Sequence, residues 1–98
     1  MNLKITKATQ DHSRYFKKEV LEDGAAYVVS DTNSVVGMFS FMIDGVQATL
    51  NFPYCINKKA IEMALNAFME DYPEIQEIKS LSMQKLDDLG FKNKIYTK

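Results

Sequence analysis

The sequence predicts a small domain of the α+β class, and three features carry this prediction. Residues 35–43 (VVGMFSFMI) have β-type composition and are apolar on both faces. An Asp-Gly turn follows and leads into a segment in which apolar and polar residues alternate, as in a β-hairpin. Directly after this hairpin, apolar residues recur at helical spacing from Ile61 to Tyr72. Strands and a helix that follow one another in this way indicate a sheet packed against helices.

Composition limits the size and the partners of this domain. A chain of 98 residues is long enough for one hydrophobic core, so residues 1–98 are expected to form a single domain. Hydrophobic residues make up 46% and charged residues 26%, which is typical of a globular protein and not of a disordered one. A net charge of -1 gives no general attraction for nucleic acid or for an anionic membrane. The sequence therefore predicts neither a nucleic acid nor a membrane as a partner.

Cysteine and histidine each occur once, as Cys55 and His12. A lone cysteine forms no internal disulfide, and together the two residues cannot supply a standard zinc site. The first residues lack the apolar segment of a signal peptide, and no apolar run reaches transmembrane length. These features favour the cytoplasm and predict no metal site.

The first third of the chain predicts a strand, a helix and a second strand. Residues 3–7 alternate as a short edge strand does. Thr9 is placed to cap a helix that continues to about Glu22, and Gly24 is its expected C-terminal stop. Ala26–Ser30 is strand-like.

The middle of the chain predicts a hairpin whose first strand is central in the sheet. A polar turn at residues 31–34 leads into residues 35–43, which should be covered on both sides. Asp44-Gly45 is a two-residue turn signal of the primed type. In the next strand Val46, Ala48, Leu50 and Phe52 share one face, and Gln47, Thr49 and Asn51 share the other.

The last part predicts a long helix, a strand, a short helix and a final strand. Asn57 is a suitable N-cap for the long helix, and Pro73 ends it. Residues 74–81 are expected to form the next strand, although their pattern also fits a helix. Residues 83–89 are expected to form the short helix and residues 91–97 the last strand. The apolar stripe of the long helix consists of Ala60, Ile61, Ala64, Leu65, Phe68 and Tyr72. The expected core is Val36, Phe39, Phe41, Ile43, Leu50, Ile61, Ala64, Leu65, Phe68, Ile78 and Leu86.

The start of the long helix is the one place where the sequence itself points to a binding site. Asn57 is followed by Lys58 and Lys59, although a helix N-terminus already carries partial positive charge. A strand, a short turn and a helix start with added cations suit a phosphate or another anion. In the alternative interpretation this is a solvated helix start, where Lys58 pairs with Glu62 one turn later.

No catalytic residue can be assigned from the pattern. Cys55 is either a nucleophile or a small buried hydrophobic residue, and the only imidazole, His12, is distant in sequence. His12 lies in the first turn of a predicted helix, where a capping or surface role is expected.

The order of these elements, with particular residues in them, resembles the GNAT superfamily of N-acetyltransferases. LKITKATQDHSRYF is similar to the family's first strand and helix, and AYVVSDTNSVVGMFSF to its second and third strands. KLDDLGF resembles the family's Tyr-x-x-x-Gly-Phe ending, with Leu86 at the tyrosine position. The resemblance spans nearly the whole chain. It implies a mixed, mostly antiparallel sheet of five or six strands with helices on both faces, in the order β-α-β-β-β-α-β-α-β.

The resemblance also implies a cofactor, acetyl-CoA or another acyl-CoA. In the family, a glycine-rich loop after the fourth strand holds the pyrophosphate through backbone N–H groups. The matching positions here contain no glycine, and Leu86 lacks the hydroxyl that the family often uses as a general acid. The chain is also shorter than a usual member. The positions that would contact the cofactor are Phe52, Tyr54, Cys55, Ile56, Asn57, Lys58 and Lys59.

Two functions follow from the resemblance. In the first, the chain is a small GNAT-like N-acyltransferase with acyl-CoA against its fourth strand and the phosphates at the long helix. In the second, it is a non-catalytic GNAT-like binding or regulatory module. Its surplus of apolar residues, including Met38 and Met42, would then serve a homodimer or a protein partner.

Overall fold

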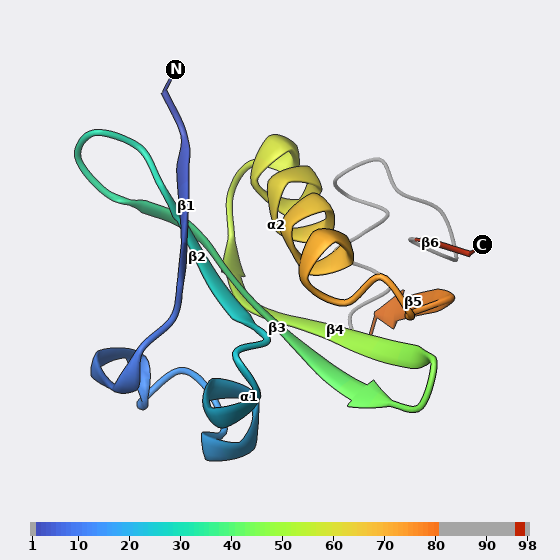
Figure 1. Cartoon of the computed structure of the whole chain (residues 1–98). Helices are drawn as coiled ribbons and strands as arrows, with labels where there is room; N and C mark the ends of the chain where they lie inside the picture. The colour runs from blue at the N-terminus through green and yellow to red at the C-terminus, as the bar shows by residue number, and fades with distance from the viewer. Residues whose placement is uncertain (1, 81–95, 98) are drawn as a thin grey trace.

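The computed structural model describes residues 2–80 and 96–97, and within them the chain forms one mixed sheet with helices on its two faces (Figure 1). The sheet has the order β1-β2-β3-β4-β5-β6, and of its neighbouring pairs only β4 and β5 are parallel. The α+β class and the mostly antiparallel sheet are confirmed. The strands are β1 (Lys4–Lys7), β2 (Ala26–Ser30), β3 (Val35–Asp44), β4 (Gln47–Cys55), β5 (Glu77–Ser80) and β6 (Tyr96–Thr97). The helices are the 3₁₀ helix η1 (Gln10–His12), α1 (Lys18–Asp23) and α2 (Lys58–Asp71).

The larger core lies between α2 and one face of the sheet. Helix α2 crosses over from β4 to β5, so the two strands point the same way and their registers match from Gln47 with Glu77 to Leu50 with Ser80. The rings of Phe41 and Phe68 stack at 3.9 Å between centroids. This core consists of Ala25, Tyr27, Val29, Val36, Phe39, Phe41, Ala48, Leu50, Phe52, Ala60, Ile61, Ala64, Leu65, Phe68, Ile75 and Ile78. Of the predicted core, Ile43 is only partly buried and Leu86 lies outside the described residues.

A smaller cluster covers part of the opposite face. Phe16 and Val20, from the segment around α1, pack on Ala26 and Val28 of β2. Because α1 is short, Met42 of β3 on the same side stays 47% exposed. The central strand β3 is therefore covered fully by α2 and only partly by α1.

The helix predicted from Thr9 to Glu22 is wrong in its first half. Thr9 does act as a cap, but for the single turn η1, and α1 begins only after Lys17, whose backbone is extended (ψ 148°). The physical reason lies in the sequence between Gln10 and Arg14, which has no apolar residue to pack on the sheet. A short helix without a packed face is not stable in water. The predicted stop at Gly24 is confirmed, with a left-handed φ of 71°.

The predicted hairpin is present, with its turn shifted by one residue. Asp44 pairs with Gln47, so the two turn residues are Gly45 and Val46 and not Asp44 and Gly45. Gly45 has a φ of 63°, which the first central position of a primed turn requires. Val46 consequently lies in the turn, 45% exposed, and not on the inward face of β4. The last two predicted elements fall mostly on residues 81–95, outside the described part of the chain.

Candidate functional site

The junction between β4 and α2 is the site that the sequence predicts, and Asn57 caps the helix there as expected. Its side-chain Oδ1 accepts a hydrogen bond from the backbone N–H of Lys59 at 2.8 Å. Its carbonyl oxygen accepts from the backbone N–H of Ala60 at 3.1 Å and from the thiol of Cys55 at 3.2 Å. Asn57 therefore uses one of the N–H groups that an anion at a helix start would otherwise receive.

A β-bulge precedes this junction and divides the predicted site residues between two surfaces. Met38 pairs with Tyr54 and Ser40 with Asn51, so β4 has one extra residue in this interval, at Phe52-Pro53. A bulge tolerates Pro53, because proline has no N–H to donate to the neighbouring strand.

Four of the predicted residues differ widely in exposure as a result. Phe52 is 2% exposed and belongs to the core under α2, so it does not reach a surface ligand. Cys55 is partly buried against the same core. Tyr54 is 40% and Ile56 62% exposed, which leaves two large apolar side chains on the surface next to the helix start.

A second cation lies near Lys59. A surface hollow of about 530 Å³ is lined by Asn2, Leu3, Lys4, Lys59 and Met63, and we call it the Lys4–Lys59 hollow. No acidic side chain is among these lining residues. The hollow therefore combines positive charge from β1 and α2, which lie far apart in sequence, with an apolar wall. No local sequence pattern indicates this combination.

His12 has the capping role that the sequence predicts. Its Nδ1 accepts a hydrogen bond from the backbone N–H of Thr9 at 3.0 Å, which completes a capping box around η1.

The strongest electrostatic perturbation lies at the other end of α2. The Tyr27 hydroxyl donates a hydrogen bond to the Asp71 carboxylate at 2.7 Å, and Lys7 Nζ is 3.4 Å from the same oxygen. Burial raises the pKa of Tyr27 well above its usual value, and the hydrogen bond and charge of Asp71 raise it further. Tyr27 therefore stays protonated and acts as a structural tie between β2 and α2. The nearby Tyr72 hydroxyl likewise donates to the carbonyl of Asp23.

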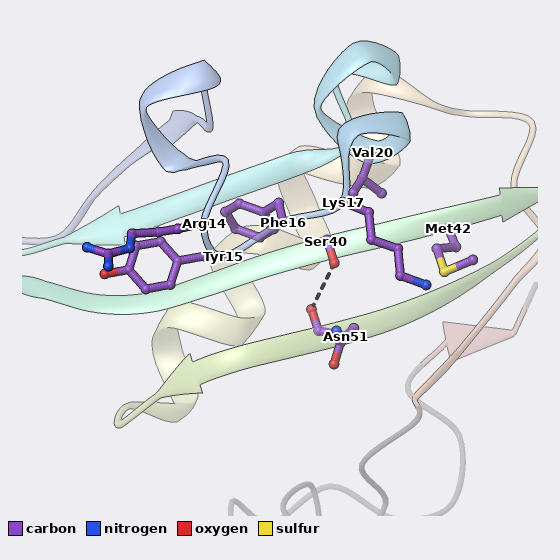
Figure 2. A pocket seen from close by; sticks show the side chains of 8 residues that line it. All are labelled: Arg14, Tyr15, Phe16, Lys17, Val20, Ser40, Met42 and Asn51. Atoms are coloured by element: carbon purple, nitrogen blue, oxygen red, sulfur yellow. Dashed lines mark hydrogen bonds between the residues drawn. The ribbon is translucent and has the colours of Figure 1, made fainter.

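A further cavity, not anticipated from the sequence, lies on the side of the sheet that carries α1 (Figure 2). We call it the α1-side hollow. Its volume is about 320 Å³, and it lies between the segment that joins η1 to α1 and the strands β3 and β4. Its lining residues are Arg14, Tyr15, Phe16, Lys17, Val20, Ser40, Met42 and Asn51. The sequence pattern does not indicate it, because residues 14–17 were expected to be helical and Asn51 was placed only on the polar face of its strand.

In residues 2–80 and 96–97, no helix is long and apolar enough to cross a membrane. In the same residues, no three histidine, cysteine, aspartate or glutamate side chains lie close enough to hold a metal ion together. No protein-family model, no curated protein and no solved structure matches this chain.

Proposed function

We propose that this chain is a GNAT-like domain that binds an acyl-CoA at the junction of β4 and α2. The observation that carries the proposal is the path of the chain from β4 through α2 into the parallel strand β5. This path brings the positive end of α2 to the carboxyl end of β4, and ligands of sheets with parallel strands commonly bind at that end. Strand β4 continues beyond its pairing with β5 at Leu50 and reaches Cys55 before the helix begins.

The chemistry of the junction suits the two ends of such a cofactor. Lys59 and Lys4 line one hollow and offer positive charge to the phosphate groups. Leu3 and Met63 of the same hollow, together with the exposed Ile56 at the helix start, offer apolar surface for the acyl and pantetheine parts. Since Asn57 already uses the Lys59 N–H, attraction rests on flexible lysine side chains and less on backbone donors. The expected affinity is therefore modest and sensitive to salt.

The proposal is one of binding, with acyl transfer as a slow or absent activity. Direct transfer to an amine needs a positioned acceptor and a group that removes a proton. Among the described residues, the two tyrosines with a raised pKa, Tyr27 and Tyr72, lie at the opposite end of α2 and hold structural hydrogen bonds.

A second candidate function, a non-catalytic module that associates with itself or with a protein partner, rests on a different observation. Several large apolar side chains lie on the surface that α1 leaves open. A patch of this kind favours an interface. Its most exposed members on β3 and β4 are Val35 (37%), Met42 (47%) and Tyr54 (40%).

A thermal-shift experiment with acetyl-CoA tests the first proposal. A ligand at about 100 times its Kd adds about 2.7 kcal/mol, which raises the Tm of a domain of this size by about 10–20 °C. Pantetheine, which lacks the phosphates, is the matched ligand and should give a much smaller shift.

The variant K58E/K59E should lose the shift, whereas K18E, which removes a lysine on α1, should keep it. No shift with acetyl-CoA at millimolar concentration would exclude the acyl-CoA proposal and leave the interaction module. In that case size-exclusion chromatography decides, because a monomer at high concentration would contradict self-association.

A further inference from the structure

The α1-side hollow has the size of a small-molecule site. Its volume of about 320 Å³ lies at the lower end of the range of about 300–1,000 Å³ that such sites occupy. The segment of residues 14–17 forms one wall, and the outer faces of β3 and β4 form the floor (Figure 2). It shares no lining residue with the Lys4–Lys59 hollow.

The charged side chains at this hollow are all basic. Arg14 and Lys17 line it, no acidic residue does, and neither cation forms an ion pair within the part of the chain that the structure describes. The Arg14 guanidinium lies 6.0 Å from the centroid of the Tyr15 ring, and the Lys17 side chain extends toward Met42 and Asn51 (Figure 2). The neighbouring Lys18, by contrast, pairs with Glu22 at 3.7 Å. Neither cation at the hollow is therefore held in an ion pair, although Glu19 lines an adjoining hollow together with Lys17.

The lining of the hollow combines apolar side chains with a small polar strip on β3 and β4. Ser40 is buried, and its hydroxyl donates to the carbonyl oxygen of Asn51 at 3.4 Å. The Asn51 side chain, on the polar face of β4, can offer its amide N–H groups. Phe16, Val20 and Met42 supply the apolar surface around this strip. Donors beside apolar side chains suit a ligand with one anionic end and an apolar body.

We propose that the α1-side hollow binds a small organic anion, with its carboxylate or phosphate group at Lys17 and the Asn51 amide. The flat apolar body of this ligand lies along Phe16 and Met42, and Arg14, beside Tyr15, adds positive charge at the far rim. The site is independent of the acyl-CoA proposal, because it uses different residues on the opposite face of the sheet.

An NMR titration of the ¹⁵N-labelled chain with benzoate tests the proposal. Benzoate should shift the amide signals of residues 14–20 together with those of Ser40, Met42 and Asn51. Benzamide has the same ring without the charge, and it should bind about tenfold more weakly or worse, because the charge-assisted hydrogen bond to Lys17 is lost. Phenyl phosphate serves as the second anionic probe, and the tighter of the two anions identifies the preferred group.

Two variants locate the charge requirement. R14Q/K17Q should weaken benzoate binding by about tenfold or more. K18Q is the control, because it removes a positive charge from a neighbouring residue that does not line the hollow. It should bind benzoate as tightly as the unmodified chain does. The amide spectra of the variants themselves show whether each is folded.

Any of four results overturns the proposal. The first two are binding of benzamide as tight as that of benzoate, and binding of benzoate by R14Q/K17Q as tight as that by the unmodified chain. The other two are signal shifts confined to the start of α2 and no shift with either anion at about 10 mM, beyond which binding is too weak to count as a site.

Discussion

Replacement of Phe68 by alanine should destabilise this domain more than most single changes. Phe68 is fully buried, its ring stacks on Phe41 at 3.9 Å, and it meets Tyr72 at 5.0 Å. Truncation of a buried phenylalanine costs about 3–5 kcal/mol, and the stacked ring pair places Phe68 in the upper part of that range. The total stability of a domain of this size is about 5–15 kcal/mol, so the F68A variant should lose a large share of it.

Urea denaturation followed by circular dichroism measures this effect. With a slope of about 1–2 kcal/mol per M, a loss of about 4 kcal/mol lowers the midpoint by about 2 M or more. F68L is the milder companion, since it keeps most of the volume and should cost about 1–1.5 kcal/mol. An unchanged midpoint for F68A would show that the packing of α2 on the sheet is described wrongly. The double variant F41L/F68L tests the ring stack itself. If its loss of stability equals the sum of the losses in F41L and F68L, the stack adds no stability of its own.

Two further predictions concern single contacts. Y27F removes the hydrogen bond to Asp71 and should cost about 1 kcal/mol at neutral pH. Because folding raises the pKa of Tyr27, its stabilising contribution is complete below about pH 10 and is lost as the unfolded chain ionises above it. The difference in urea midpoint between the unmodified protein and Y27F should therefore narrow from pH 9 to pH 11. A constant difference would contradict a stabilising hydrogen bond from Tyr27 to Asp71. G37A should cost about 1–3 kcal/mol, because its methyl group would lie 2.5 Å from the buried Phe39 ring. A G37A variant with the original Tm would show that this ring has room to move.

The parts of the fold that the sequence predicted are those in which a local pattern coincides with burial. The alternation in β4 and the stripe of α2 are read from neighbouring residues, and the same neighbours form the core. The helix expected from Thr9 failed because a capping signal alone cannot hold a segment that has nothing to bury.

The candidate sites also combine features that a local pattern predicts with features that depend on long-range packing. Asn57 could be assigned as a cap from its local sequence. The grouping of Lys4 with Lys59, and of Arg14 and Lys17 with Asn51, depends on how distant segments pack, and no local pattern encodes it.

The bulge in β4 changes which positions of that strand face inward. Up to Phe52 the even-numbered side chains point into the core, whereas beyond Pro53 the odd-numbered Cys55 packs there and the even-numbered Tyr54 points out. A single added residue thus changes the inward-facing positions of the strand from even to odd numbers. Deletion of Pro53 would leave Phe52, Tyr54 and Cys55 in regular alternation, with Tyr54 still opposite Met38 and Cys55 still on the core side. The extra residue therefore lets Phe52 and Cys55 face the same core although an even number of positions does not separate them.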